Sequence, residues 1–328
     1  MKIKKISGIL ILLLCAVMGF GEEKPSTKNM DFELIYEPDF GFMYGLIREN
    51  VWKANMRVSS EAITYTPTTE LSRLDWELYN NKFMGSTISL IFNKKFLFNF
   101  NLQNALSGTV GVMEDFDWNS PDPKHLTNYS NHDLILHSFF DTSFLAGYIF
   151  HFGKKIDFTF TPSFGFHTQK LFFEGYAGFD TYESNNWEIR LYEKAPVIFY
   201  SQGFTATVLN LNGGIELPKY FSMNAGFAFS YINKIFCKDQ HIRKGKQYCD
   251  IIQSAWLIEG SLKLFYKINK NHKIGLFGGF NFMPDAYGFT YMSFENYEED
   301  PSKPDYSDLG GTSRLIFNYG IVYSFHLR

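Results

Sequence analysis

Apolar and polar residues alternate along several long segments of the chain, and this period of two constrains the fold more than any other feature. Successive side chains of a β-strand point to opposite faces, so the pattern predicts strands with one apolar and one polar face. The apolar faces are rich in aromatic residues. The clearest of them are Phe40, Phe42, Tyr44 and Leu46; Phe96, Phe98, Phe100 and Leu102; Phe221, Met223, Ala225, Phe227, Phe229 and Tyr231; and Leu315, Phe317, Tyr319, Ile321, Tyr323 and Phe325.

The aromatic content favours a barrel in lipid over a soluble β-sandwich. The chain has 36 Phe and 20 Tyr, and aromatic residues make up 19% of it, yet only 45% of its residues are hydrophobic. A membrane barrel needs such a composition because lipid-facing and lumen-facing residues alternate. A soluble sandwich would not need so many aromatic side chains on one face.

Short turns and long polar stretches follow one another regularly. Because four short turns and five long loops join ten strands, we expect an all-β protein, a ten-stranded antiparallel transmembrane β-barrel with short periplasmic turns and long external loops. The turns are 93–95, 153–155, 217–219 and 269–272, and the loops are 53–69, 118–131, 178–192, 238–250 and 291–311.

The N-terminus has the pattern of a secretory signal peptide. Lys2, Lys4 and Lys5 precede an apolar run that ends at Phe20, and Gly21 fits a cleavage site. We therefore expect residues 1–21 to be a signal peptide and residues 22–328 to form the barrel. The full chain carries a net charge of −3, and loss of the three Lys leaves −6, which argues against a nucleic-acid partner.

Two short acidic motifs are candidates for chemistry. Asp115 and Asp117 end the third expected strand and share one face of it, while Asp239 stands two residues before His241 in the fourth expected loop. A carboxylate near an imidazole can orient it and stabilise its protonated form. Taken alone, either motif is more often a solvated loop. Cys237 and Cys249 flank this loop and could form a disulfide, which the sequence leaves open.

The alternation also predicts which way these side chains point. Even residues of the third strand are aromatic, so Asp115 and Asp117 should face the lumen if no bulge intervenes. Odd residues of the seventh strand are aromatic, so strict alternation would point Asp239 and His241 outward. A bulge or a distortion of the loop must redirect them if they belong to an internal site.

These motifs together resemble those of the omptins, a family of ten-stranded outer-membrane endopeptidases. The similarity rests on Met113–Trp118 with the following Asn-Ser-Pro, on Asp239-Gln240-His241, and on Leu71–Trp76 at the start of the second strand. It covers residues 31–325. The individual motifs are short, but their order, spacing and placement in loops are specific.

The resemblance implies a division of labour among four catalytic residues. Asp239 and His241 would form one pair and Asp115 and Asp117 the facing pair, with a water held between them as the nucleophile. His241 would be the general base, oriented by Asp239. The resemblance requires no Ser or Cys nucleophile and no metal. His125, His132 and His137 are not expected to be metal ligands.

The resemblance also implies a binding pocket and a lipid cofactor. Two acidic residues form the base of the omptin pocket for basic side chains, and the matching positions here are Glu49 and Cys237. We expect cleavage near a basic P1 residue, weakened or broadened by Cys237. Omptins require lipopolysaccharide, and Lys170 matches one of its contacts, whereas Gly203, Phe166 and Thr168 replace polar partners. No covalent cofactor is expected.

Three functions remain open on the sequence. The first is an outer-membrane endopeptidase with its active site facing outside, acting on polypeptide substrates and contacting outer-membrane lipid. The second is an adhesin or surface-binding barrel of the same fold with weak catalysis. The third is a narrow pore, which leaves the Asp and His motifs unexplained. The oligomeric state cannot be predicted.

Overall fold

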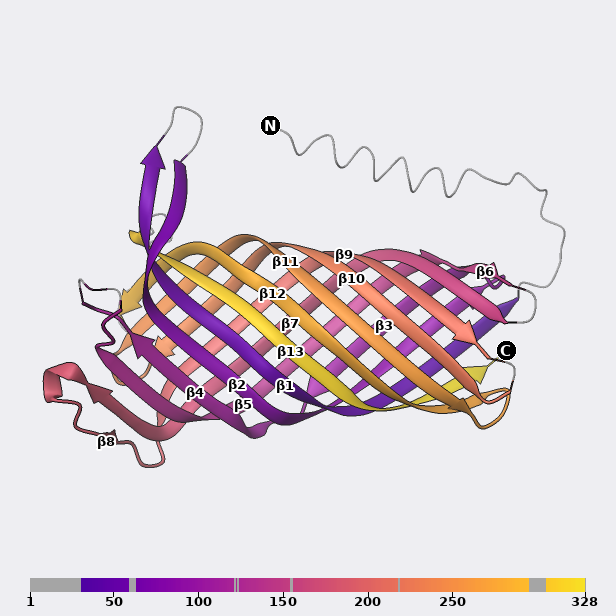
Figure 1. The fold of residues 1–328 in the computed structure, drawn as a ribbon, viewed down its shortest axis with the longest axis horizontal. Coiled ribbons are helices and arrows are strands. Elements are labelled where there is room, and N and C mark those ends of the chain that lie inside the picture. Colours follow the sequence, from indigo (N-terminus) through magenta and orange to yellow (C-terminus); the bar gives the residue numbers. More distant parts are fainter. Residues whose placement is uncertain are drawn as a thin grey trace. The chain divides into compact units, whose positions relative to one another are not determined.

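The computed structural model describes residues 31–58, 63–120, 122, 124–153, 156–217, 219–294 and 305–327, so the predicted signal peptide 1–21 lies outside the described residues. These residues form an antiparallel β-barrel with a three-residue 3₁₀ turn at Glu183–Asn185 (Figure 1). Within them, no helix has the length and apolarity needed to cross a membrane. The strands are β1 Phe32–Val58, β2 Ile63–Phe92, β3 Phe96–Ala105, β4 Gly108–Asp117, β5 Asn128–Tyr148, β6 Phe150–Phe152, β7 Asp157–Tyr182, β8 Arg190–Leu191, β9 Pro196–Glu216, β10 Phe221–His241, β11 Lys246–Lys267, β12 His272–Phe294 and β13 Asp305–Leu327.

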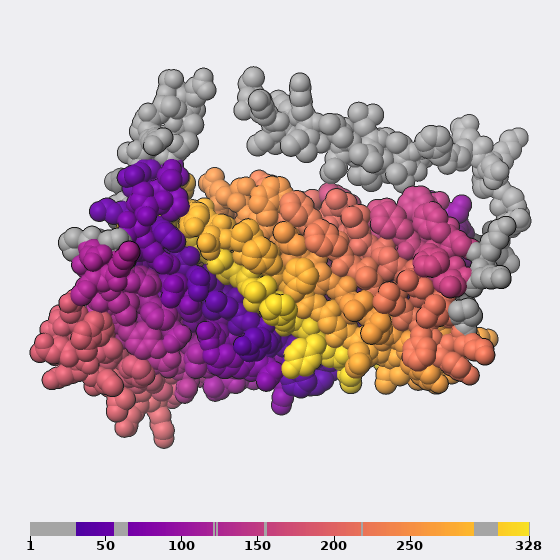
Figure 2. All heavy atoms as spheres, viewed as in Figure 1, coloured from indigo at the N-terminus to yellow at the C-terminus, as the bar shows by residue number. Residues whose placement is uncertain are grey.

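Ten strands make up the ring, which confirms the predicted architecture. β3 and β4 follow one another along the same place in the ring and count as one strand, since both pair with β2 on one side and β5 on the other. β6 continues β5 along β7, and the short β8 lies off the ring. The ring closes where β1 pairs with β13, drawn in indigo and yellow side by side in Figure 2. Closure leaves no open sheet edge, which a lipid-exposed sheet requires.

The connections differ at the two ends of the barrel as predicted, although two external loops are shorter than expected. Four tight connections follow β2, β6, β9 and β11. Most of the first expected loop, 53–69, is a hairpin in which β1 and β2 stay paired up to Val58 and Ile63. Most of the loop expected at 238–250 is also strand, because β10 continues to His241 and β11 begins at Lys246. The Asp239–His241 motif therefore lies on a strand.

An apolar belt covers the outer wall. The residues predicted to face lipid are exposed there, among them Phe98, Phe227 and Phe317. We take this belt as the membrane-spanning part of the barrel. Exposed members of the belt near the external end include Tyr44 on β1, Leu106 after β3 and Trp256 on β11, whose ring contacts Tyr231 of β10. The strand segments beyond those residues project outside the membrane.

An irregular seam crosses three neighbouring strands just above the belt. The β9–β10 register shifts between Ile232 and Lys234, so Asn233 is an extra residue on β10. Ser254, directly across on β11, has a positive φ of 70°. The β12–β13 register shifts between Met283 and Ala286. Each irregularity reverses the inside–outside alternation of its strand, as a bulge does, so the upper parts of β10, β11 and β12 turn their other face to the lumen.

The lumen beneath the external end is filled by packed side chains. Trp76 stacks between Phe173 and Tyr200 at ring-centroid distances of 5.6 and 5.2 Å, and all three rings are fully buried. Nearby, Arg314 donates hydrogen bonds to Gln169 and, at 2.7 Å, to Gln202. This layer separates the external end from the rest of the lumen.

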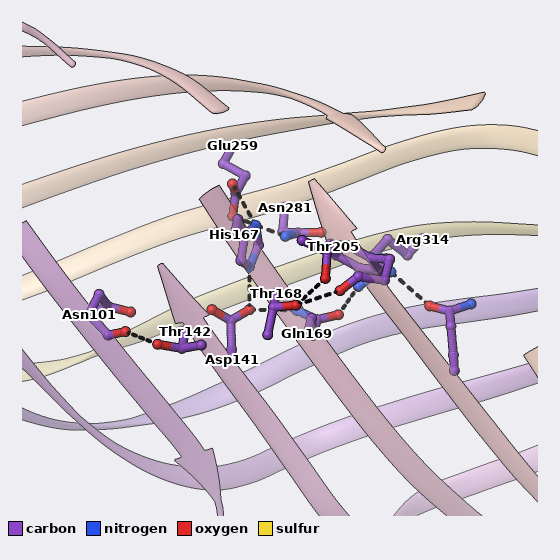
Figure 3. Close-up of polar contacts among 12 residues, drawn as sticks. Asn101, Asp141, Thr142, His167, Thr168, Gln169, Thr205, Glu259, Asn281 and Arg314 are labelled. Carbon is purple, nitrogen blue, oxygen red and sulfur yellow. Dashed lines mark hydrogen bonds and ion pairs between the residues drawn. The ribbon is translucent and has the colours of Figure 1, made fainter. Parts of the chain in front are cut away.

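A polar network continues from this layer into the membrane-spanning part. His167 lies between Asp141 and Glu259, with Nε2 2.9 Å from one carboxylate and Nδ1 3.7 Å from the other (Figure 3). The network borders a lower cavity of ≈450 Å³ that shares no lining residue with an upper cavity at the external end. Such packing between the two cavities does not favour the pore hypothesis.

Candidate active site

The upper cavity is a cleft at the external end of the barrel, with a volume of ≈550 Å³. β4 contributes Asp115 and Asp117 to its lining, and the end of β10 contributes His241. The rest of the lining comes from β5, the end of β7, the segment leading into β9 and the residues after β10. The barrel thus brings together three of the four predicted catalytic residues, although they come from motifs far apart in sequence.

Asp239 and His241 form an ion pair inside the barrel. Nε2 of His241 lies 2.7 Å from Oδ2 of Asp239. Asp239 is buried, with only 3% of its surface exposed. Asn233 makes this inward placement possible, so that of the two expected causes, a bulge and a loop distortion, the bulge is the one present. Burial lowers the pKa of His241, but Asp239 and then Asp115 outweigh it, so the pKa of His241 is raised.

Asp115 and Asp117 face the lumen as predicted, but not because β3 and β4 are regular. The strand breaks between Ala105 and Gly108, and its register with β5 shifts again between Thr109 and Gly111. The two irregularities cancel, so odd residues point inward again at Asp115. The prediction was correct, whereas its condition that no bulge intervenes was wrong.

The two carboxylates of this strand have different environments. Oδ2 of Asp117 accepts a hydrogen bond from Asn128 Nδ2 at 3.0 Å. Oδ1 of Asp115 is buried, and no described group hydrogen bonds to it. Burial, followed by repulsion from Asp117, raises the pKa of Asp115 to about 8, although His241 and Lys244 oppose the shift. Asp115 therefore holds a proton more readily than an ordinary carboxyl group.

Glu49 is buried close to both pairs. It is 2% exposed, and no described group hydrogen bonds to its Oε2. Burial raises the pKa of Glu49 well above its ordinary value, and Asp239, Asp250 and Asp115 raise it further. The predicted pocket residue thus belongs to an acidic cluster that also contains the Asp239 carboxylate.

Sequence reasoning missed Asp250, which belongs to the same cluster. This residue lies on β11 directly opposite Cys237 and is 2% exposed. Burial raises the pKa of Asp250 to about 7, against the effect of a hydrogen bond from Thr290. The available signal was the hairpin itself, because β10 and β11 joined by a tight turn pair these two positions. The expected loop at 238–250 concealed it.

The two cysteines are not joined. Cys237 is buried in the lumen, where Gln202 Nε2 lies 3.5 Å from its sulfur. Cys249 pairs with Lys238, one position further along each strand, and therefore lies on the opposite face of the wall. A disulfide between them would have to cross the sheet, which disulfide geometry does not allow.

A group of basic and aromatic residues around Asp180 also lines the cleft, and sequence reasoning did not find it. Asp180 accepts hydrogen bonds from Arg190 Nε at 3.0 Å and from Tyr182 at 3.1 Å, and also from Tyr192. The guanidinium of Arg243 lies 3.6 Å from the centre of the Tyr192 ring. The cleft therefore has an acidic wall at Asp115 and a rim of opposite charge.

Of the other residues considered in the sequence, His132 lines the cleft, whereas Lys170, His125 and His137 do not. Lys170 is exposed on β7, opposite Gly203 on β9. His137 Nε2 lies 2.5 Å from Glu174 on the outer wall, and His125 Nε2 lies 2.8 Å from Glu183. The described part of the chain has no group of three or more His, Cys, Asp or Glu side chains suited to a metal ion.

Comparisons with known proteins give the family and the fold of the chain. The family model described as "Omptin family" matches residues 55–325. No curated protein sequence matches the chain. The crystal structure of the outer membrane protease OmpT from Escherichia coli superposes with a TM-score of 0.72 at 19% identity, covering 92% of this chain and all of that one. This likeness establishes the fold.

Other solved barrels resemble the chain only loosely. The outer membrane protein OprG from Pseudomonas aeruginosa has a TM-score of 0.34 at 10% identity, covering 89% of this chain and 96% of that one. The translocator domain of the autotransporter NalP from Neisseria meningitidis has a TM-score of 0.32 at 9% identity, with 96% of each chain covered.

Proposed function

The chain belongs to the omptin family of outer-membrane proteins, and on that premise we propose that it is an endopeptidase that hydrolyses polypeptides at the cell surface. One observation carries the proposal. His241, which is paired with Asp239, lines the same cleft as Asp115, and both Asp115 and Asp239 retain a buried oxygen that no described group hydrogen bonds. Buried acceptors without partners are rare, and here they offer hydrogen-bonding positions to water and substrate.

The proposed mechanism uses a water molecule held between His241 and Asp115. Because Nε2 of His241 is paired with Asp239, the other ring nitrogen, Nδ1, takes a proton from this water as the oxygen attacks the scissile carbonyl carbon. Asp239 orients the imidazole and stabilises its protonated form. When the tetrahedral intermediate collapses, the C–N bond breaks and the imidazolium returns the proton to the leaving amine. The reaction needs no covalent intermediate with the protein.

Asp115 and Asp117 have a different role in this mechanism. Two carboxylates on one face share a proton more easily than both ionise, because like charges repel in a buried site. A protonated Asp115 can donate a hydrogen bond to the oxygen that gains negative charge. The raised pKa of Asp115, about 8, keeps this proton in place near neutral pH.

We further propose a basic residue at P1. Glu49 is buried in the acidic cluster beside the catalytic pairs, and no described group pairs with its Oε2. An ammonium or guanidinium group would form a charge-assisted hydrogen bond with this carboxylate and relieve its repulsion from Asp239. A neutral side chain would leave the carboxylates without a counter-charge.

Lipopolysaccharide is the proposed lipid cofactor, with Lys170 as one contact. The Lys170 side chain is exposed on the outer wall, where a phosphate group could reach it. Gly203, its cross-strand neighbour, contributes no side chain to such a site. This lipid contact therefore depends on fewer protein groups than the family resemblance implies, and we expect weaker binding than a complete set would give.

A mixed peptide library tests the proposed activity. The refolded barrel should cleave it after basic residues, and lipopolysaccharide should increase the rate. Cleavage sites are read by mass spectrometry, and heat-modifiable migration on a gel confirms that the barrel is folded. If a folded barrel cleaves nothing with or without lipopolysaccharide, the endopeptidase proposal is wrong and a surface-binding function takes its place.

The pH dependence of kcat/KM provides a separate test. His241 must be neutral to accept a proton, so activity should fall as pH drops below its raised pKa. Asp115 must be protonated, so activity should also fall as pH rises above about 8. Asp115 faces Asp117 on its own strand, Asp239 and His241 on β10, and Lys244 in the following turn.

We therefore expect kcat/KM for one peptide, measured between about pH 5 and about pH 10, to follow a bell-shaped profile. The midpoint of its acid side should lie above the ordinary histidine pKa of roughly 6.5. The two apparent pKa values of this profile describe the coupled groups together and are not those of single residues. A profile that is flat across this range would contradict the assigned protonation states.

A further inference from the structure

The basic-residue pocket has one acidic residue fewer in this sequence than the family resemblance implies, and the fold replaces it. Resting on the proposed endopeptidase function, we propose that Asp250 is the second carboxylate of the P1 pocket and acts with Glu49 to select basic side chains. The carboxylate expected at position 237 is thus supplied from the neighbouring strand.

The strand register places Asp250 at the required position. Cys237 and Asp250 are directly opposite one another on β10 and β11. Opposite residues of an antiparallel pair lie on the same face, with Cβ atoms about 5 Å apart. A carboxylate on either strand can therefore reach the same part of the lumen. Both residues are buried, at 3% and 2% exposed.

The irregular seam makes Asp250 face the lumen together with its support. Ser254 reverses the alternation of β11 below Asp250, and the shift between Met283 and Ala286 does the same for β12. Thr290 on β12 consequently points inward too, and its Oγ1 donates a 2.9 Å hydrogen bond to Asp250 Oδ1. Sequence-distant irregularities thus present a carboxylate and the group that orients it.

Space for this carboxylate comes from Gly310 on β13. A Cβ atom at Gly310 would lie 2.1 Å from Asp250 Cγ and 2.2 Å from Oδ1, closer than atoms can approach. Any side chain there would push the carboxylate out of its position. The glycine and Thr290 together hold Asp250 from two neighbouring strands, so it is a positioned group.

Glu49 supplies the independent observation that points to a ligand. Its Oε2 is buried, and the described residues provide no hydrogen-bond donor for it, although Asp239 and Asp250 both lie close enough to raise its pKa. Buried like charges are costly without a counter-charge. The charged groups that act on the pKa of Glu49 are Asp239, Asp250 and Asp115, with no Lys or Arg among them, so a cationic side chain of the substrate would supply the missing counter-charge.

Cys237 is consistent with this arrangement. Its thiol is neutral, and an Asp at that position would stand directly opposite Asp250, where like charges destabilise a strand pair. One carboxylate on one of the two strands supplies the charge without that repulsion.

The test compares two peptides that differ only in arginine or norleucine at the position that is cleaved. In Asp250→Asn, the ratio of their kcat/KM values should fall about tenfold or more, the loss expected for a charge-assisted hydrogen bond. The ratio does not depend on the fraction of protein that folds. Asp133→Asn, an exposed acid on β5, is the matched control and should keep the parental ratio.

A second variant returns the carboxylate to β10. Cys237→Asp combined with Asp250→Asn should restore at least part of the arginine preference, because the two positions face the same region. An arginine preference that Asp250→Asn leaves unchanged would overturn the inference. So would a parental protein that cleaves both peptides equally well.

Binding separates this inference from the proposed catalysis. In His241→Ala, fluorescence anisotropy of the same labelled peptides should show tighter binding of the arginine peptide, and addition of Asp250→Asn should remove the difference. If the parental protein cleaves nothing but this difference appears, the endopeptidase proposal fails while the role of Asp250 in cation binding holds. If neither cleavage nor the binding difference appears, both proposals are wrong.

Discussion

Replacing His241 with alanine is expected to lower kcat/KM about 10³-fold or more while the barrel still folds, because the reaction loses its general base. The imidazole is held 2.7 Å from Asp239 at the edge of the cleft and does not support the membrane belt. Peptide cleavage measured on protein with intact heat-modifiable migration gives the result directly.

The chain provides a matched control for this variant. His137 also pairs with a carboxylate, that of Glu174, but lies on the outer wall. His137→Ala should cleave at the parental rate. Asp239→Asn should be impaired like His241→Ala, and the double variant little worse than either, since groups that act as a unit are not additive. A folded His241→Ala protein with parental activity would exclude the mechanism.

The second large effect is expected for Asp115→Asn. An amide retains the shape of the carboxyl group but cannot hold the proton shared with Asp117, so we expect kcat to fall by about 10²- to 10⁴-fold. Asp115 is also the group whose raised pKa of about 8 sets the alkaline limit of activity. The residual activity of the variant should therefore lack that limb when kcat/KM is measured against pH.

Asp122→Asn is a suitable comparison for this variant. Asp122 lies in the loop that follows β4, where its Oδ1 accepts a hydrogen bond from the Lys124 backbone, and it does not line the cleft. Its removal should leave both the rate and the pH profile unchanged. An Asp115→Asn protein that retains the alkaline limb would show that another group sets it.

Local alternation predicted the barrel well because lipid contact imposes a strict chemical difference between the two faces of each strand. Phe98, Phe227 and Phe317 are exposed on the outer wall as that rule requires. The loops were harder to predict, since residues above the membrane face water on the outside and lose the aromatic signal. The hairpin beyond Trp52 and the upper part of β10 were consequently expected to be loops.

The site depends on relations between strands that one sequence does not contain. A bulge was required at the top of β10, but its position at Asn233 follows from pairing with β9. Asp115 faces inward through two irregularities that cancel. Asp250 was missed because its importance comes from lying opposite Cys237 on the neighbouring strand. The disulfide stayed open on the sequence because the strand pairing, which places Cys249 on the other face of the wall, was not known.

The seam across β10, β11 and β12 also determines how such a site can be altered by evolution or transferred by engineering. No exchange of one amino acid for another changes which face of a strand a residue occupies, whereas loss of a single codon at Asn233 would shift every residue after it by one position. Asp239 and His241 would then be directed toward the outside of the wall. A chimera that receives β10 alone would inherit its catalytic pair without Asp250 or Thr290 turned to meet it. The three strand ends are therefore one heritable module, and they can be exchanged between barrels only together.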